Sequence, residues 1–168
     1  MGQREEETVS FLPEERFRAA IAKRFAELEA QLSALIPGAE IHHVGSTAVP
    51  GSLTKGDLDI QVRLRAAQFE QASFRLRELF SVNEGGFSDV DAVSFEDNGA
   101  IPSVGIHLTV IGSPSDVQTE FRDRLLASES LRRQYDDLKR KFEGGSMEAY
   151  RTAKAEFVSR VLNKESEA

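Results

Sequence analysis

The chain has 168 residues, with 21 lysines and arginines against 28 aspartates and glutamates, which gives a formal net charge of −7 at pH 7. This length suits a single domain, and so acidic a chain does not attract long duplex nucleic acid, whose binding requires cations against the phosphates. The absence of cysteine excludes disulfides, thiolate zinc sites and cysteine nucleophiles. No apolar run approaches the roughly 18 residues of a membrane span, and the polar residues 1–7 do not resemble a signal peptide. We therefore expect a cytoplasmic protein with no membrane partner.

The first predicted element is an amphipathic helix, followed by a short strand. Pro13 suits the first turn of the helix, and Pro37-Gly38 ends it. Between them, apolar residues recur at spacings of three and four, namely Phe17, Ile21, Phe25, Leu28, Leu32 and Leu35. The strand is expected over residues 39–44, directly before Gly45-Ser46.

The next strand is predicted by strict alternation over residues 57–63. Leu58, Ile60 and Val62 lie on one face, and the residues between them are polar. A helix is expected over residues 66–80 and a loop over 81–90.

Two further strands are predicted at residues 92–95 and 103–111, joined through Asn98-Gly99, a dipeptide typical of hairpins. From Ser115 onward the chain is expected to be helical, with a break at Gly144-Gly145 and a last helix capped by Ser146. The predicted fold is α+β: a small mixed β-sheet of four or five strands, an N-terminal helix and a C-terminal helical segment. We expect one domain over residues 1–168, with its core at about 13–112 and its helical part at about 114–164.

Asp57 and Asp59 form the first candidate site. They are two residues apart on one strand, so both carboxylates project from the same face, with Cα atoms roughly 6.6 Å apart. A divalent cation bound at about 2.0–2.1 Å per ligand can bridge such a pair, and the two charges repel unless something positive lies between them. The alternative is an exposed strand face with two solvated acids.

Gly45-Ser46 forms the second candidate site, because it directly follows a predicted strand. Glycine lets backbone N–H groups approach a phosphate, and the serine hydroxyl adds a donor. The alternative is an ordinary turn. The segment lacks the Gly-Lys-Ser/Thr ending of a P-loop.

Together, a strand, Gly-Ser, a spacer and Asp-x-Asp resemble the nucleotidyltransferase superfamily that includes DNA polymerase beta. A closer resemblance, to the GrpB-like family of that superfamily, covers roughly residues 13–162. Members of this family occur alone or fused to dephospho-coenzyme A kinase. The matching segments are Ile41-His42-His43-Val44-Gly45-Ser46-Thr47-Ala48-Val49-Pro50-Gly51, Lys55, Asp59-Ile60, His107-Leu108-Thr109-Val110, Phe121-Arg122-Asp123, Tyr135 with Leu138-Lys139, and Tyr150 with Lys154.

The resemblance implies a site that binds a nucleoside triphosphate (NTP) with Mg²⁺, or with Mn²⁺. It makes Asp57 and Asp59 the catalytic and metal-binding residues. The residues it assigns to nucleotide binding are Gly45, Ser46, Thr47, Lys55, His43, His107 and Lys154.

Two departures from the superfamily pattern matter. Many relatives have an apolar residue where this chain has Asp57, which makes this site more complete than theirs. The superfamily's third carboxylate is missing from the strand at 105–110, which offers His107 and Thr109 instead. A third acid would then have to come from the preceding strand or loop, where the candidates are Asp89, Asp91, Glu96 and Asp97.

Several candidates also have structural interpretations. His43 could bind phosphate, ligate metal, act as a base or pack the turn, and Lys55 could contact phosphate or pair with Asp57. Tyr150 and Lys154 share a helix face and could contact nucleotide, or be a half-buried tyrosine beside a surface lysine. The basic clusters 132–133 and 139–141 are expected on a solvated helix face.

The leading functional hypothesis is transfer of a nucleotidyl group from an NTP to an acceptor that the sequence does not identify. The alternative is a catalytically silent nucleotide-binding or regulatory module. A third, minor hypothesis is a metal-dependent hydrolase that uses His43, His107 and the two aspartates.

Overall fold

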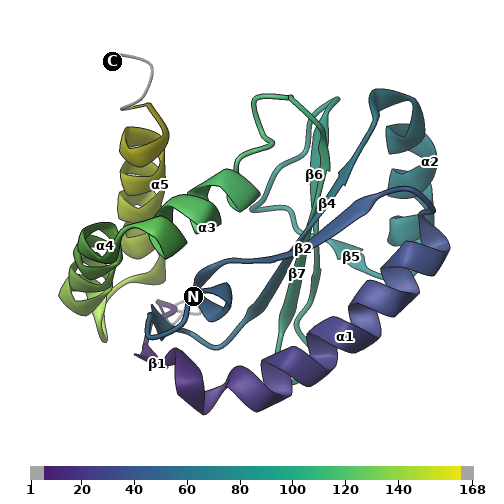
Figure 1. Ribbon diagram of the computed structural model, residues 1–168. Helices are drawn as coiled ribbons and strands as arrows, with labels where there is room; N and C mark the ends of the chain where they lie inside the picture. The colour runs from purple at the N-terminus through teal and green to yellow at the C-terminus, as the bar shows by residue number, and fades with distance from the viewer. Residues whose placement is uncertain (1–5, 164–168) are drawn as a thin grey trace, which may run out of the picture.

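The computed structural model describes residues 6–163; residues 1–5 of the polar N-terminal run and residue 164 of the expected helical part lie outside the described residues. Figure 1 shows a central sheet with α1 and α2 beside it and α3–α5 gathered at one end. The elements in chain order are β1 (Leu12–Pro13), the 3₁₀ helix η1 (Glu14–Arg16), α1 (Arg18–Leu35), β2 (Glu40–Val44), the 3₁₀ helix η2 (Ser46–Ala48), β3 (Leu53–Thr54), β4 (Leu58–Leu64), α2 (Ala66–Arg77), β5 (Ser81–Val82), β6 (Ala92–Asp97), β7 (Val104–Val110), α3 (Gln118–Ala127), α4 (Glu129–Phe142) and α5 (Met147–Asn163).

The main sheet has five strands in the order β2-β4-β7-β6-β5. β4 and β7 run parallel, and the other neighbouring pairs are antiparallel. A second sheet pairs β1 with β3. The fold is therefore α+β with a mixed sheet, which confirms the prediction.

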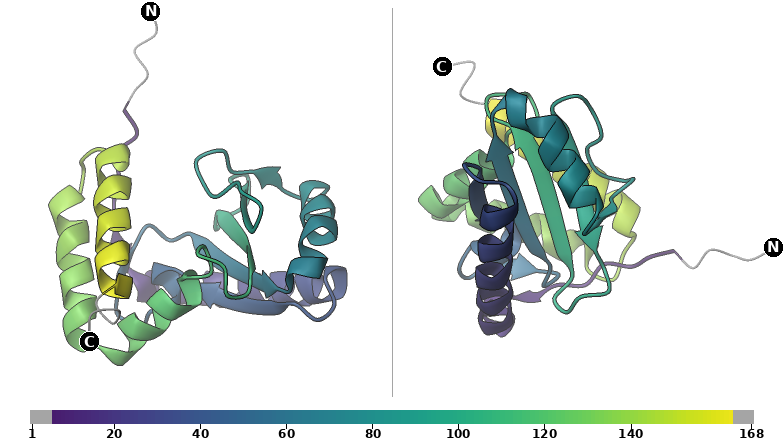
Figure 2. Two further views of the ribbon diagram at one scale, coloured as in Figure 1. Left: turned by 90° about the horizontal axis from the view of Figure 1, so that it is seen from above. Right: turned by 90° about the vertical axis from the view of Figure 1, so that its right-hand side faces the viewer.

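The two faces of the main sheet differ, as the alternation in β4 predicts. Leu58, Ile60, Val62 and Leu64 are fully buried or nearly so and belong to the core that α1 and α2 share with the sheet. Figure 2 shows α1 and α2 together over this face, with α3–α5 on the other side. The opposite face carries the polar residues of β4.

Some boundaries differ from the sequence prediction. Pro13 lies in β1 rather than in the first helical turn, and η1 precedes α1. Short strand β5 occupies part of the expected loop. The hairpin between β6 and β7 does not turn at Asn98-Gly99 alone, because Asp97 pairs with Val104 and residues 98–103 form the connection. Pro102 has no N–H to continue the ladder.

Lys139, which the sequence predicts on a solvated helix face, instead links α4 to the start of β3. That prediction is wrong, because the Lys139 side chain is 1% exposed. Its Nζ donates to Ser52 Oγ at 2.9 Å and to the Leu53 carbonyl at 2.6 Å, and it lies 3.3 Å from Asp136 Oδ1. Burial lowers the pKa of Lys139 to about 8.

No helix within residues 6–163 combines the length and apolar character needed to cross a bilayer.

The far end of the polar face of β4 is tied to the start of α3. Arg63 donates from Nε and Nη2 to the two oxygens of Asp116, at 2.7 and 2.8 Å. The buried Gln61 side chain donates to Thr109 and Asp116 and accepts from the Thr119 backbone N–H. Hydrogen bonds from Arg63 lower the pKa of the Asp116 carboxyl.

We expect Asp116→Asn to lower the free energy of unfolding at pH 7 by about 2 kcal/mol, because it breaks a charge-assisted pair whose carboxylate is almost buried. A lowered pKa stabilises the folded state above the unfolded value of 3.8, and this contribution is lost as pH falls through the folded pKa. Urea unfolding of both proteins at several pH values should therefore show the difference shrinking below about pH 4. A difference that stays constant to low pH would contradict this.

Candidate functional site

Asp59 lies on the polar face of β4, with glycine on both sides of its carboxylate. A Cβ added to Gly45 would lie 2.5 Å from Asp59 Oδ2, and one added to Gly105 would lie 2.8 Å from Oδ1. Gly45 also has φ 77° and ψ −177°, a backbone region that is essentially open to glycine alone. Both carboxylate oxygens therefore lie against backbone, in space that any other residue at these positions would fill.

A histidine and two lysines act on the Asp59 carboxylate. Burial by itself would raise the pKa of the Asp59 carboxyl, but the His107 ring, Lys154 and Lys55 outweigh it, and this pKa lies below its ordinary value. His107 Nε2 is 3.6 Å from Asp59 Oδ1, and 32% of the Asp59 side chain is exposed. The site thus holds an ionised, accessible carboxylate beside two lysines.

Asp57 directly precedes β4 and is paired with Lys55. Such a pair is one of the two roles that the sequence suggests for Lys55. The Lys55 Nζ lies 3.3 Å from Asp57 Oδ2, and both side chains are about one third exposed. The Asp57 carbonyl accepts a 3.0 Å hydrogen bond from the Thr47 hydroxyl. Thr47 therefore fixes the backbone that carries Asp57, and its own side chain is buried.

Ser46 begins η2, next to Gly45 and hence next to Asp59. Its hydroxyl donates to Thr54 Oγ1 at 2.8 Å, and the Gly56 N–H donates to the same oxygen at 3.1 Å. The buried Thr54 of β3 thereby orients Ser46 and the loop that leads to the carboxylates.

His43 lies on the face of the sheet opposite to Asp59, because its register partner is the core residue Ile60. Its ring stacks on Phe25 of α1, with centroids 5.3 Å apart, and its Nε2 is 2.9 Å from Thr47 Oγ1. Since the Thr47 hydroxyl gives its proton to the Asp57 carbonyl, it can only accept from His43, whose Nε2 must carry hydrogen. Burial lowers the pKa of His43, so this ring is a neutral donor that supports the turn.

His107 lies on the same face as Asp59, one row further along β7, opposite Gln61. Its Nδ1 is 3.1 Å from the Oγ of the buried Ser94 in β6. His43 and His107 are therefore on opposite faces, which contradicts a hydrolase that would use both. Within residues 6–163 there is no group of three histidine, aspartate or glutamate side chains that could hold a metal ion by themselves.

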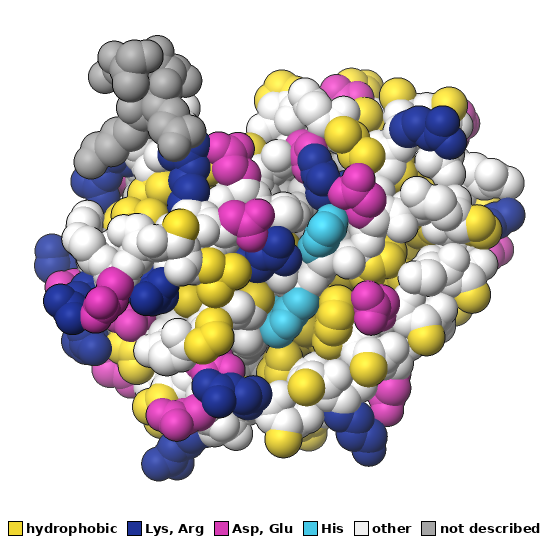
Figure 3. Space-filling model, in the orientation of Figure 1, with side chains coloured by type: hydrophobic (Ala, Val, Ile, Leu, Met, Phe, Trp, Pro, Cys, Tyr) yellow, Lys and Arg dark blue, Asp and Glu magenta, His cyan; other side chains and the backbone are white. Residues whose placement is uncertain are grey.

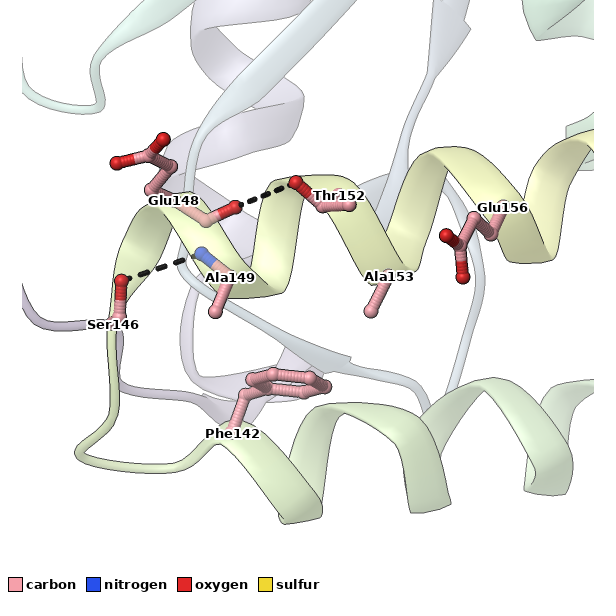
Figure 4. A pocket seen from close by; sticks show the side chains of 7 residues that line it. All are labelled: Phe142, Ser146, Glu148, Ala149, Thr152, Ala153 and Glu156. Atoms are coloured by element: carbon pink, nitrogen blue, oxygen red, sulfur yellow. Dashed lines mark hydrogen bonds between the residues drawn. The ribbon is translucent and has the colours of Figure 1, made fainter.

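Helix α5 brings Lys154 to the site, and Tyr150 lies one turn before it. Tyr150 is buried rather than half-buried, and burial raises its pKa. A groove of about 450 Å³ lies on another face of α5, where it is lined by Phe142, Ser146, Glu148, Ala149, Thr152, Ala153 and Glu156 (Figure 4). None of those seven residues belongs to the candidate site.

The surface in the orientation of Figure 3 carries acidic and basic side chains close together, with histidines exposed near its middle. Basic groups do not gather there into a continuous area.

Gly105 and Thr54 belong to the site but are not among the residues predicted from the sequence. Gly105 carried a signal, because glycine inside a strand often marks the close approach of another group. Thr54 carried none, since its contact with Ser46 depends on β3 folding back beside η2.

Comparisons with known proteins support the same fold. The family model described as GrpB protein matches residues 15–164. A UPF0157 protein from Vibrio cholerae serotype O1 is 28% identical over 158 residues, which are 94% of this chain and 84% of that protein. The crystal structure of conserved protein GrpB from Enterococcus faecalis superposes with a TM-score of 0.69 at 17% identity, over 92% of this chain and 98% of that one.

A more distant likeness is to the Cid1 poly(U) polymerase, in a crystal structure with MgGTP bound. The TM-score is 0.52 at 12% identity, over 73% of this chain and 40% of the polymerase. This likeness shows a shared nucleotidyltransferase-like fold. With a family match that spans nearly all of its length, the chain belongs to the GrpB family.

Proposed function

We propose that this protein binds an NTP together with a divalent cation, Mg²⁺ or Mn²⁺, and transfers the nucleotidyl group to an acceptor. The observation that carries the proposal is the Asp59 carboxylate, which lies between two glycine backbones and faces cations from two separate elements. A structural ion pair would not require glycine on both sides of its acid. The Cid1 polymerase, of similar fold, is described with MgGTP bound.

The donor set fits a cation that arrives with the nucleotide. Asp57 and Asp59 supply hard carboxylate oxygens, and Mg²⁺ is usually held by one or two carboxylates, several waters and substrate phosphates. When bound, the cation would neutralise charge on the phosphates and that developing at the transferred phosphorus.

The chain's own residues would position the NTP. The N–H groups after Gly45 would donate to the distal phosphates. The Ser46 hydroxyl, which donates to Thr54 in the structure, would turn its proton to a phosphate, and the Thr54 hydroxyl would then donate to Ser46 Oγ and keep it in place. Lys55 and Lys154, which both act on Asp59, would add positive charge to the site. Oriented donors of this kind stabilise a phosphoryl-transfer transition state without reorganising during the reaction.

A catalytically silent nucleotide-binding module is the second candidate. The observation that favours it is the composition of β7 on the face that carries Asp59. There, Gly105 and His107 occupy the positions where a third acid would be expected. Both candidates require nucleotide binding at Asp57 and Asp59, and they differ in whether transfer follows.

Incubation with labelled NTPs, either metal and a pool of acceptors from a cell extract separates the two candidates. We expect label to move from the NTP to an acceptor with the wild type and not with Asp57→Ala. The matched control Asp137→Asn changes an exposed acid on α4 and should retain transfer. Metal-dependent NTP binding without any transfer would establish the silent module, and no binding of any NTP would contradict both candidates.

Lys154→Met should weaken NTP binding at least about tenfold, because a hydrogen bond to a charged group contributes about 1.5–3 kcal/mol. The variant keeps the length of the side chain on α5 and removes its charge. Calorimetric titration should show unchanged affinity for Lys141→Met, which alters an exposed lysine on α4. Equal affinity of the Lys154 variant and the wild type would remove Lys154 from the nucleotide site.

A further inference from the structure

Charge is unevenly divided around the candidate site. From Glu78 to Phe121 the sequence contains no lysine or arginine, and this segment builds β5, β6, β7 and their loops. The acidic residues in it are Glu78, Glu84, Asp89, Asp91, Glu96, Asp97, Asp116 and Glu120. Lys55, whose Nζ lies 3.3 Å from Asp57 Oδ2, and Lys154 of α5 come from segments outside it, and the only histidine within it is His107.

Glu96 lies in the same row of the sheet as Asp59. The register pairs Asp59 with Gly105 across β4 and β7, and Gly105 with Glu96 across β7 and β6. Residues in such a row share a face, and Gly105 places no side chain between the two acids. Among residues 6–163, the Glu96 side chain has no hydrogen-bond or ion-pair partner, so its charge is available to a ligand.

Phe87 adds an apolar surface beside this row. Its side chain is exposed, and its ring meets the His107 ring edge-on, with centroids 6.3 Å apart. The Phe87 N–H donates to Ser94 Oγ at 3.1 Å, and the Ser94 N–H donates to the Phe87 carbonyl at 2.9 Å. Ser94 therefore holds both Phe87 and His107, and the exposed ring is fixed on the face that carries Asp59.

The geometry of nucleotidyl transfer determines from which side the acceptor reaches the phosphorus. In nucleotidyl transfer the attacking and leaving oxygens lie roughly in line on opposite sides of the phosphorus. With the distal phosphates at Ser46 and Lys55, which lie on the β2 and β3 side of Asp59, we expect the acceptor to approach from the β7–β6 side. It would then meet Phe87, His107 and Glu96, in a segment without lysine or arginine.

We propose that the acceptor is a small hydroxyl compound that carries an ammonium group and a ring, such as an amino sugar, and not the end of a nucleic acid. This inference rests on the proposed function. Glu96 pairs with the ammonium group, and Phe87 packs against the ring. A nucleic acid would instead place its phosphates beside Glu96, in a segment with no lysine or arginine to neutralise them.

The step itself is a simple exchange of bonds. The acceptor oxygen forms a bond to the α-phosphorus, the bond from that phosphorus to the oxygen bridging to the β-phosphate breaks, and pyrophosphate leaves. The hydroxyl proton goes to solvent. Glu96 and Phe87 orient the acceptor and take no part in the bond change.

The test measures acceptor binding without any NTP, so that its failure is distinct from failure of the proposed function. The chain has no tryptophan, so Phe87→Trp introduces a single tryptophan at the acceptor end, whose fluorescence can be excited apart from that of the two tyrosines. The probes are a trisaccharide of glucosamine, its neutral N-acetylated form and a hexaadenylate RNA. Equilibrium dialysis of the glucosamine trisaccharide with the wild type repeats the measurement without the fluorophore.

We expect saturable binding of the glucosamine trisaccharide, at least tenfold weaker binding of the neutral form, and a similar loss in Glu96→Gln. Glu78→Gln removes the same charge from the end of α2, on the other face of the sheet, and should bind as the wild type does. Melting temperatures confirm that each variant is folded. Equal binding of charged and neutral sugars, or tighter binding of the RNA, would overturn the proposal. The proposal would also be overturned if Glu96→Gln lost metal-dependent NTP binding and still bound the glucosamine trisaccharide, since Glu96 would then be a metal ligand.

Discussion

Asp59→Asn is expected to abolish metal-dependent NTP binding while leaving the fold intact. Loss of residues that merely support a metal ligand typically costs 10–100-fold in metal affinity, so loss of the ligand itself should cost at least about 100-fold. Calorimetric titrations with each NTP, in Mg²⁺, in Mn²⁺ and without metal, measure the effect. The asparagine keeps the size and shape of the side chain between Gly45 and Gly105, so a loss of binding would come from charge.

The structure also predicts how Asp59→Asn changes stability. Two neighbouring acids, considered by themselves, would repel, and removing one charge would then stabilise the protein. The neighbours of Asp59 reverse this expectation, because the His107 ring, Lys154 and Lys55 together lower its pKa and so favour its charged form in the folded protein. We expect the variant without metal to unfold slightly more easily, by at most about 1 kcal/mol for this partly exposed group. A variant that bound NTP as well as the wild type would contradict the assignment of Asp59.

Gly45→Ala should both destabilise the protein and displace Asp59. A residue held in a backbone region reserved for glycine costs about 1–3 kcal/mol, and the new Cβ would lie only 2.5 Å from Asp59 Oδ2. Since Asp59 or the loop must move, we expect NTP binding to be lost even at temperatures where the variant is folded. Urea unfolding and NTP titration measure the two effects separately.

Gly144→Ala is the matched control for that experiment. Gly144 has φ 73° and no atom within 4 Å of an added Cβ, so its substitution adds backbone strain in the turn before α5 without a contact to the site. It should lower stability and leave the NTP affinity unchanged. If both variants bound NTP normally, the close fit between Gly45 and Asp59 would have no role in the site.

The polar face of β4 was predictable from the sequence because a strand's period of two is fixed by its geometry. The same holds for the Gly45-Ser46 turn, which follows the short strand β2 and lies beside Asp59. The mixed sheet was predicted from the order of the elements, and the nucleotidyltransferase-like fold from the resemblance to a known family; both are confirmed by the structure and its relatives.

What escaped prediction depends on tertiary packing. His43 faces α1 because of the register between β2 and β4, which no pattern within β2 reveals. Lys139 is buried because β3 offers it the Leu53 carbonyl and Ser52, residues more than 80 positions away. The approach of Lys154 to Asp59 likewise depends on where α5 packs, and helix periodicity alone does not determine that position.

Binding of Mn²⁺, followed by electron paramagnetic resonance with and without a non-hydrolysable NTP analogue, shows whether Asp59 holds a cation together with the nucleotide. We expect the protein to hold Mn²⁺ tightly only when the analogue is present, Asp59→Asn to hold it in neither case, and Asp137→Asn to behave as the wild type. Failure to hold Mn²⁺ with any NTP analogue, or equal retention by Asp59→Asn, would contradict this expectation.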